Sequence, residues 1–460
     1  MESFELAEVC ADSPEEIRTV TTNTPISEPA HDSEANVQEL PAIDGGWRAW
    51  RFCASAFAIE VIIWGFEFSY GIFQDYYTSN APFQNVSPVT VAAVGTSALA
   101  IQYGEALFLS LFFERYPDLL AASAWLGLGV VAVSLLLASF ASKVWQLVML
   151  QGVGFGIGGG LMYFPIVALL PQWFSQRRGL ATGIIFSGSG LGGFAFPYIL
   201  EAMLTRLGFR WTLRIWCIAT SILGGISLLG MKPRLPVPKF QRGQTRPRFI
   251  PPQLHFIKTP HFWALSIATG LQALSYYSVS LYISTFTKAI STPLYASIVL
   301  SLFNSSGVVC QIIMGLLCDR LPYAWIMSVS ALGGGLAAFL LWGFAHTLPL
   351  VIAFAIVFGG LMGGFNSVGP AAAADCAGSK PEQSSLIWAC SWVLKGVAVV
   401  IGPIISGVLY DTGRSALHTN ELRYGAFGFK NFEIFVGTCA VATSLASIVV
   451  AATRNRVVRP

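Results

Sequence analysis

Apolar runs of roughly 20 residues alternate with short polar breaks from Trp50 to about residue 452. A helix of that length crosses the hydrocarbon core of a bilayer, since it rises ~1.5 Å per residue. The pattern predicts an all-α membrane protein with twelve transmembrane helices, six on each side of a longer polar break. These helices are 50–73, 90–113, 120–141, 144–170, 179–201, 211–231, 262–285, 294–317, 323–345, 348–374, 385–410 and 431–452.

Composition agrees with a lipid environment. Hydrophobic residues make up 54% and charged residues 11% of the chain, and the mean hydropathy is +0.62, which excludes an ordinary soluble domain. The eight cysteines stand singly, without CxxC or metal-ligand spacing, so neither a disulfide framework nor a metal site is expected. We expect no cofactor, no nucleic-acid partner and a monomer in the bilayer.

The polar segments divide the chain by charge. Residues 1–43 carry ten acidic residues against Arg18, and this composition predicts a disordered tail that is not a cleavable signal peptide. The break at 232–260 carries seven basic residues and no acidic one. It separates a first half, residues 44–231, from a second half, residues 261–452, and a short tail follows at 453–460.

Basic residues predict the orientation. Lys and Arg concentrate on the cytoplasmic side of membrane proteins, and twelve helices place eighteen of the 27 on the side of the 232–260 break and eight on the other. Both termini are therefore predicted to be cytoplasmic, in a multi-pass protein of the plasma membrane. One cation, Lys395, falls inside a predicted helix.

Two motifs carry a resemblance to a known family. The segment 173–197 resembles the signature of the monocarboxylate porter family of the major facilitator superfamily, although Gln176 replaces a lysine and Ile185 a small residue. The positions that match are Trp173, Phe174, Arg177, Arg178, Leu180, Ala181, Gly183, Gly188 and Gly192. Asp44 to Trp47 resemble the second signature of that family, with Arg48 departing from it, and residues 64–77 look like its fungal branch. The resemblance covers about residues 44–452.

The resemblance implies the major facilitator fold and a loop motif that clamps neighbouring helices in one conformation. Asp319 and Arg320 match this motif, four residues after Gly315. In the first half the motif is degraded to Glu114 and Arg115, followed by Asp118. The alternative for these charges is a solvated loop.

Ionisable residues within a predicted span are functional candidates because their burial is costly. Four qualify: Glu60, Glu67, Glu105 and Lys395. At ~1.5 Å per residue, Lys395 and Glu105 lie about 14 Å and 12 Å from the cytoplasmic ends of their helices. The fold implied by the resemblance sets these helices opposite each other. Lys395 is thus predicted to contact substrate, to pair with Glu105, or to be a structural lysine that reaches the membrane surface.

Other side chains share a face with these candidates. Glu60 is expected near the midplane, where it could bind a proton or meet Lys395, whereas Glu67 is expected to be hydrated near the outer surface. Trp388 and Trp392 share the Lys395 face, which suggests an aromatic pocket; lipid contact is the alternative. Weaker candidates, each equally suited to a bond between helices, are Gln272, Tyr276, Asn304, Gln311 and Asn366.

The coupling residues that the resemblance implies are missing. Animal members of the family use a lysine in the first helix and an Asp–Arg pair in the eighth, where this chain has Gln311 and Gly307. Lactate-type proton symport is therefore not expected, and a coupled proton would require Glu60 or Glu105. Asn85 begins a glycosylation sequon in the first external loop.

These observations predict a transporter that moves a small organic acid or metabolite, such as a fungal secondary product, by alternating access. The alternatives are a facilitative carrier of a neutral nutrient and a nutrient sensor without flux. An enzyme is not expected, since no nucleophile, base or metal set is placed together.

Overall fold

A computed structural model describes residues 41–84, 86, 88–236, 246, 248–249, 254–378, 383–415 and 424–457. The predicted acidic tail, apart from its last three residues, and the predicted glycosylation site at Asn85 lie outside these residues.

The first half is built of helices with short irregular connections. Within the first predicted span, α1 (Gly46–Phe68) and α2 (Tyr70–Ser79) follow one another through Ser69. The other helices of this half are α3 (Pro88–Arg115), α4 (Leu120–Ala138), α5 (Val144–Leu147), α6 (Phe155–Trp173) and α7 (Arg178–Gly230), with a 3₁₀ turn at Pro117–Leu119 and a π-helical segment at Val148–Gly154.

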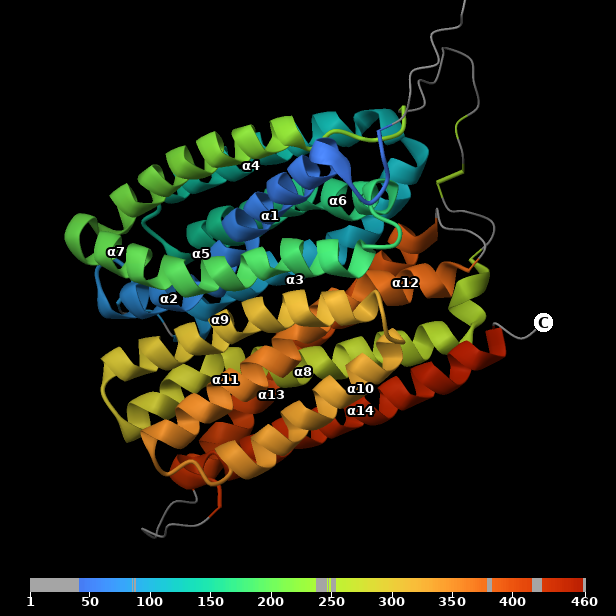
Figure 1. The fold of residues 1–460 in the computed structure, drawn as a ribbon. Coiled ribbons are helices and arrows are strands. Elements are labelled where there is room, and N and C mark those ends of the chain that lie inside the picture. Colours follow the sequence, from blue (N-terminus) through green and yellow to red (C-terminus); the bar gives the residue numbers. More distant parts are fainter. Residues whose placement is uncertain are drawn as a thin grey trace, which may run out of the picture. The chain divides into compact units, whose positions relative to one another are not determined.

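Helix α7 contains two of the predicted spans. Its 53 residues would measure roughly 80 Å as a straight helix, far more than a bilayer core of about 30 Å. Gly208 interrupts it with φ 72° and ψ 167°, a left-handed φ that glycine adopts without a steric penalty. The two arms run back in opposite directions from this bend (Figure 1), and they correspond to the predicted helices 179–201 and 211–231.

The second half repeats the pattern. Its helices are α8 (Pro260–Ile290), α9 (Pro293–Cys318), α10 (Tyr323–Leu336), α11 (Leu348–Gly364), α12 (Gly369–Ala377), α13 (Ser384–Ser415) and α14 (Lys430–Val457). Shorter segments lie at His255–Lys258, Ala337–Trp342, Phe365–Val368 and Ala426–Gly428.

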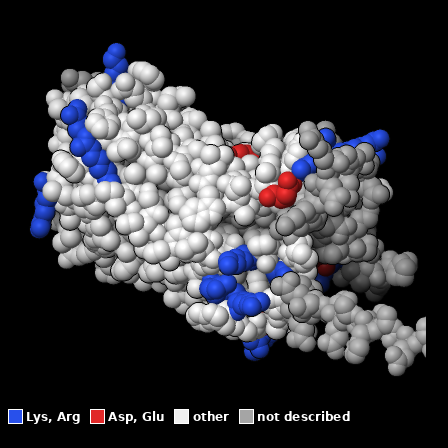
Figure 2. Space-filling view, turned by 90° about the horizontal axis from the view of Figure 1, so that it is seen from above, with Lys and Arg blue, Asp and Glu red and all other residues white. Residues whose placement is uncertain are grey.

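Ten helical stretches among the described residues are long and apolar enough to cross a membrane. One of them is α7 with its two arms, and the more polar α8 adds 31 residues, so the helices provide twelve crossings. The prediction of two six-helix halves is confirmed. A broad part of the face in Figure 2 carries no charged residue, as a lipid-facing surface requires.

Glycines bring helices together within and between the halves. A Cβ on Gly65 of α1 would overlap the backbone of Gly192 on α7. Across the halves, a Cβ on Gly179 would overlap the Gly315 carbonyl of α9. Small residues at such contacts let transmembrane helices approach closely, so the glycine-rich segment 173–197 holds α7 against both halves.

The described start of α1, the end of α7, the start of α8 and the end of α14 lie at one end of the helices (Figure 1). We call this end the linker side. The opposite end, which holds the last turns of α2 and α8, is the far side.

Candidate functional site

A cavity of about 660 Å³ lies between the two halves. The first half contributes side chains from α1, α3, α6 and α7, and the second half contributes side chains from α8, α9, α12, α13 and the 3₁₀ turn before α12. Six predicted residues line it: Glu60, Gln311, Asn366, Trp388, Trp392 and Lys395. The cavity thus brings together residues up to 335 positions apart.

Lys395 is the cation of this cavity. Its side chain is 4% exposed, and its Nζ donates a hydrogen bond of 2.7 Å to Oδ1 of Asn366. The same nitrogen lies 5.3 Å from the ring centroid of Tyr103, within range of a cation–π interaction. An amide oxygen and an aromatic face therefore stabilise the ammonium group.

No carboxylate of the described residues lies within 4.0 Å of the Lys395 ammonium. Glu60 lines the same cavity and is 5% exposed, and its Oε2 has no hydrogen-bond partner. The predicted ion pair between Glu105 and Lys395 is not formed in this conformation. Lys395 can therefore receive an anion without first breaking an ion pair.

Aromatic rings form the walls beside Lys395. Trp392 of α13 lies almost parallel to Tyr163 of α6, with centroids 5.6 Å apart and an interplanar angle of 13°. Trp64 contacts Tyr103 at 5.1 Å, and Trp388 contacts Trp392 at 5.6 Å. This arrangement suits a ligand with a flat apolar part and one negative charge.

Three aromatic residues of the cavity, Tyr103, Tyr163 and Tyr277, escape sequence reasoning. Tyrosines are common in membrane helices, and nothing in the local pattern separates these from the others. Their one sequence signal is proximity to a candidate: Tyr103 stands two residues before Glu105.

Three of the weaker candidates, Gln272, Tyr276 and Asn304, lie outside the cavity lining, and Asn304 donates from Nδ2 to the Gly193 carbonyl of the first half at 3.1 Å. Gln272 donates from Nε2 to the Met362 carbonyl at 2.8 Å. Tyr276 stacks on Phe303 with centroids 5.2 Å apart. Gln272 and Tyr276 are thus placed as contacts between helices of the second half. Glu105 also lies outside the cavity lining and packs over Gly160 of α6.

The expectation that Glu67 is hydrated near the surface is wrong. Glu67 is 8% exposed and accepts a hydrogen bond from Nε2 of Gln102. The reason is that the helical stretch continues beyond the predicted end at residue 73 and reaches Ser79, for 34 residues in all. Glu67 therefore lies in its interior, a turn or two deeper than predicted.

The three sequence motifs meet at the start of α7. Asp44 accepts hydrogen bonds from the backbone N–H groups of Ser175 at 2.8 Å, Gln176 at 3.0 Å and Arg177 at 2.9 Å. Asp319, from the second half, accepts hydrogen bonds from the backbone N–H groups of Gly179 at 2.7 Å and Leu180 at 2.8 Å. A helix N-terminus favours such anions, since its first N–H groups lack partners in the helix.

These two carboxyl groups differ in acidity. Partial burial raises the pKa of Asp44, but the three backbone N–H groups and the charge of Arg177 outweigh it and leave that pKa below its ordinary value. Burial dominates at Asp319 and raises its pKa, despite the hydrogen bonds from Leu180 and Gly179. Asp44 therefore stays ionised to a lower pH than Asp319 does.

The arginines of the motifs lie apart from these bonds. Arg177 and Arg320 are exposed, whereas Arg178 is half-buried and lines a smaller cavity of about 360 Å³ beside Trp388.

The degraded motif of the first half makes a different contact. Asp118 accepts two hydrogen bonds from Arg246, at 2.8 and 3.1 Å, and Arg246 also donates to the Arg115 carbonyl at 3.4 Å. The bonds from Arg246 hold the pKa of Asp118 below its ordinary value. Glu114 is exposed at the end of α3. This motif therefore binds the chain that joins the halves.

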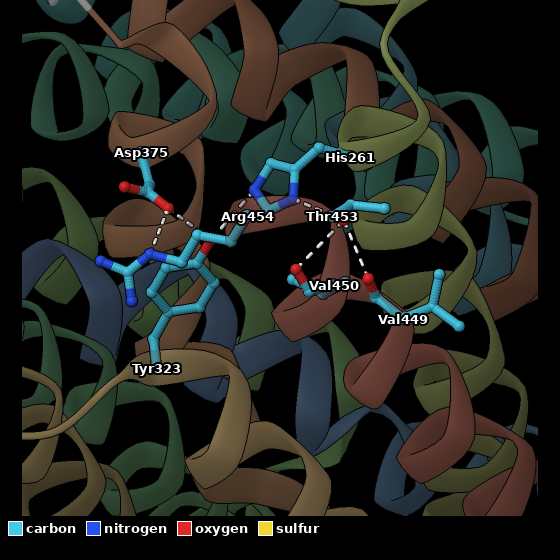
Figure 3. Close-up of polar contacts among 7 residues, drawn as sticks. All are labelled: His261, Tyr323, Asp375, Val449, Val450, Thr453 and Arg454. Atoms are coloured by element: carbon cyan, nitrogen blue, oxygen red, sulfur yellow. Dashed lines mark hydrogen bonds and ion pairs between the residues drawn. The ribbon is translucent and has the colours of Figure 1, made fainter. Parts of the chain in front are cut away.

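A second polar cluster ties the helices of the second half on the linker side (Figure 3). His261, 3% exposed, bonds through Nδ1 with Thr453 at 2.9 Å and through Nε2 with Tyr323 at 3.0 Å. The Tyr323 hydroxyl donates to Asp375 at 2.9 Å, and Arg454 pairs with the same carboxylate oxygen at 2.9 Å. The cluster fixes α8, α10, α12 and α14 to one another.

The family model of the Major Facilitator Superfamily matches residues 52–292 and 265–454. The chain therefore belongs to this superfamily of membrane transporters.

Curated relatives and a solved structure agree. The chain is 31% identical over 377 residues to the aspyridones efflux protein apdF of Emericella nidulans, covering 81% of this chain and 74% of that protein. It is 28% identical over 407 residues to the MFS-type transporter pynF of Aspergillus niger, covering 84% and 88%. The crystal structure of the human organic anion transporter MFSD10 (TETRAN) superimposes with a TM-score of 0.60 at 14% identity, over 87% of this chain and 99% of that one. This last match supports the fold alone.

Proposed function

We propose that this transporter exports an organic anion with a flat, apolar body, of the kind found among fungal secondary metabolites. The observation that carries the proposal is Lys395, buried in the central cavity among aromatic rings with an amide oxygen, and no carboxylate, as its hydrogen-bond partner. The substrate anion takes the place of a counter-ion at this ammonium group.

The energetic argument rests on the cost of a buried cation. A lysine at the centre of a membrane helix costs about 2.5–3.5 kcal/mol on insertion scales. Asn366 and Tyr103 offset part of this cost, and a bound anion offsets more because it brings an opposite charge into a site of low dielectric. Affinity for the anion follows from this unpaired charge.

Relatives favour a metabolite as the substrate. The name of one relative specifies efflux of aspyridones. Within the superfamily, the motifs at 44–47 and 173–197 favour a position near the monocarboxylate porters, in a branch without their lysine in the first helix.

The proposed orientation places the linker side in the cytoplasm. Eighteen of the 27 Lys and Arg residues belong to that side if the twelve crossings are counted from the N-terminus, and basic residues favour the cytoplasmic face. The transporter then acts as a monomer in the plasma membrane with both termini inside the cell.

Counterflow in proteoliposomes tests the proposal. Proteoliposomes that contain the purified protein are loaded with one compound at a time. The panel consists of aromatic carboxylic acids, aspyridones included, and the primary amide of each acid. We expect exchange of at least one acid and, for its neutral amide, a rate lower by about tenfold or more, equivalent to ~1.4 kcal/mol.

Substitutions at the cation sharpen the test. Lys395→Met should abolish this preference for the acid, whereas Lys395→Arg should retain part of it, because the charge is kept. Lys143→Met, at an exposed lysine outside the cavity, is the matched control and should behave as wild type. Equal exchange of acid and amide by wild type would support a carrier of neutral nutrients instead, and absence of any flux would support a sensor.

A further inference from the structure

Apart from Oε2 of Glu60 in the central cavity, three buried side-chain oxygen atoms among the described residues of the first half lack any hydrogen-bond donor. They are Oε2 of Glu67, Oε1 of Gln102 and Oε1 of Glu105. None of these residues lines the central cavity with Lys395. Glu67 and Gln102 are 8% and 3% exposed, and Glu105 is half-buried, with its Oε1 itself buried.

These atoms belong to one cluster. Gln102 and Glu105 are three residues apart on α3, so their side chains share a face, and Gln102 donates from Nε2 to Oε1 of Glu67 on α1. Helix α6 covers the cluster with two glycines. A Cβ on Gly159 would overlap the Gln102 amide, and a Cβ on Gly160 would overlap the Glu105 carboxyl. The sequence of α6 therefore leaves room for these polar side chains.

The chemistry of the unpartnered atoms is uniform, since all three are acceptors. A buried acceptor without a donor is destabilising, and two carboxylates that share a site of low dielectric repel each other. A proton relieves both problems, because a protonated carboxyl has one O–H that donates to another of these oxygens, and it loses its charge.

No cation among the described residues supplies this need. In the described part of the chain, neither Glu67 nor Glu105 has an ion pair within 4.0 Å. The titratable groups that face the cluster are Tyr103 of α3 and Tyr277 of α8, which interact with Glu67, and Tyr163 of α6, which lines a small cavity with Gln102. Glu60 of α1 and Lys395 of α13 lie farther away, on the central cavity. Nζ of Lys395 is bonded to Asn366, on the other half.

We propose that Glu67, Gln102 and Glu105 form a buried proton-binding site in the first half, separate from the anion site at Lys395. One carboxyl takes a proton from water when its side of the transporter opens and then donates a hydrogen bond within the cluster. Release is the reverse step, in which the O–H bond breaks and the proton returns to water. The site does not depend on the identity of the substrate.

Infrared spectroscopy of the purified full chain tests this site without a substrate, through the C=O stretch of protonated carboxyl groups as pH is varied. Ordinary glutamates titrate near about pH 4.3, so a band that persists at neutral pH reports buried carboxyls. We expect Glu67→Gln and Glu105→Gln each to reduce this band. In either variant the remaining carboxyl should lose its proton at a pH lower by about one unit or more, because the like charge is gone.

Three variants serve as controls. Glu201→Gln removes an exposed carboxyl and should leave the neutral-pH band unchanged. Glu433→Gln removes a distant carboxyl that is fully buried and without partners; it should reduce the band without shifting the titration of the rest. Glu105→Asp keeps a carboxyl and should retain the coupled titration, which separates loss of the site from misfolding.

Two results would overturn the proposal. One is a neutral-pH band that neither Glu67→Gln nor Glu105→Gln changes in protein that elutes as a single folded species. The other is loss of the band when sodium replaces choline at constant ionic strength, because the three oxygens would then hold a sodium ion in place of the proton.

Discussion

The two ends of the interface between the halves are closed by different kinds of contact. On the linker side, the Asp319 carboxylate of the second half accepts hydrogen bonds from two backbone N–H groups of α7, at 2.7 and 2.8 Å. Beside these bonds, Gly179 and Gly315 bring the two backbones into contact. Asp44 supports the same helix start from within the first half.

On the far side, the contact is an ion pair between Lys288 of α8 and Asp75 of α2, at 3.8 Å. The two side chains are 49% and 74% exposed, and exposed pairs of this kind contribute about 0–1 kcal/mol. Deeper in the interface, the hydroxyls of Tyr103 and Tyr277 share a hydrogen bond, and Phe68 contacts Tyr277 with centroids 6.2 Å apart.

These contacts indicate that the linker side of the interface is held more firmly than the far side. On the linker side, hydrogen bonds from the start of α7 to a carboxylate and direct backbone contact fix the position of α7 against α9. On the far side, a long and exposed ion pair does not fix α2 against α8 in this way. We therefore expect the far side to open first from this conformation, with the linker side still closed. Four predictions test this comparison.

The largest effect is expected from Gly179→Val. A branched side chain at this position would overlap the Gly315 carbonyl, and overpacking costs about 1–3 kcal/mol, equivalent to a shift of about 5- to 150-fold in a conformational equilibrium. The linker side should open and counterflow should fall by a similar factor. The measurement is the rate of maleimide labelling at Ser385→Cys, which lines the smaller cavity on this side.

A glycine elsewhere provides the control for this prediction. A Cβ on Gly129 of α4 meets no atom within 4 Å, so Gly129→Val should leave labelling and counterflow unchanged. Equal behaviour of the two valine variants would contradict the role given to the Gly179 contact.

The next largest effect is expected from Asp319→Ala. This substitution removes the acceptor for the N–H groups of Gly179 and Leu180. Hydrogen bonds to a partly exposed carboxylate are expected to contribute ~1.4 kcal/mol, which corresponds to about a tenfold change in the equilibrium between the closed and open linker side. Labelling at Ser385→Cys should rise about tenfold. Arg320→Ala, which removes an exposed neighbour without these bonds, should have little effect, and a larger change at Arg320 than at Asp319 would refute the assignment.

A smaller effect is expected from Lys288→Gln on the far side. Loss of an exposed ion pair changes the equilibrium by at most about fivefold, for ~1 kcal/mol. The distance between spin labels at the exposed Leu207 and Leu294 on the far side should therefore show only a slightly larger open population in this variant. A change as large as that of Asp319→Ala on its own side would remove the contrast between the two sides.

Acidification should have the smallest effect on the linker side. The pKa of Asp319 is raised above 3.8 by burial, and the hydrogen bonds from backbone N–H groups keep the pKa of Asp44 below 3.8. Because the pKa of Asp319 is raised in the closed state, protonation of Asp319 favours that state. Because the pKa of Asp44 is lowered, the stabilisation that ionised Asp44 gives to the start of α7 is lost only when the pH falls through that lowered pKa. Fluorescence energy transfer across the linker side should thus stay constant from neutral pH to about pH 4.5. Opening of the linker side within this range would contradict the predicted direction of the pH dependence.

The positions of the helices follow from the sequence because lipid acts on each segment separately. Every stretch that crosses hydrocarbon must be apolar for about 20 residues, and this local requirement predicts 385–410 within the observed Ser384–Ser415. Burial of Lys395 and Glu60 is predicted on the same ground, because each stands inside such a stretch.

The partners of these residues could not be predicted, because they depend on contacts between helices far apart in the sequence. Asn366, rather than Glu105, is the hydrogen-bond acceptor of Lys395, and no periodicity in either helix contains that choice. The depth of Glu67 was missed for a different reason. Polar residues such as Gln74 and Asp75 lower the hydropathy of α2, although the helix continues through them.

Distances between spin labels on the two sides test the central claim, that one cavity between two halves is closed unequally at its ends. Labels at the exposed Leu119 and Leu321 span the linker side, and labels at the exposed Leu207 and Leu294 span the far side. In ligand-free protein in lipid, the account predicts a narrow distance distribution for the linker-side pair and a broader one, with a longer component, for the far-side pair. A broad linker-side distribution beside a narrow far-side one would contradict it.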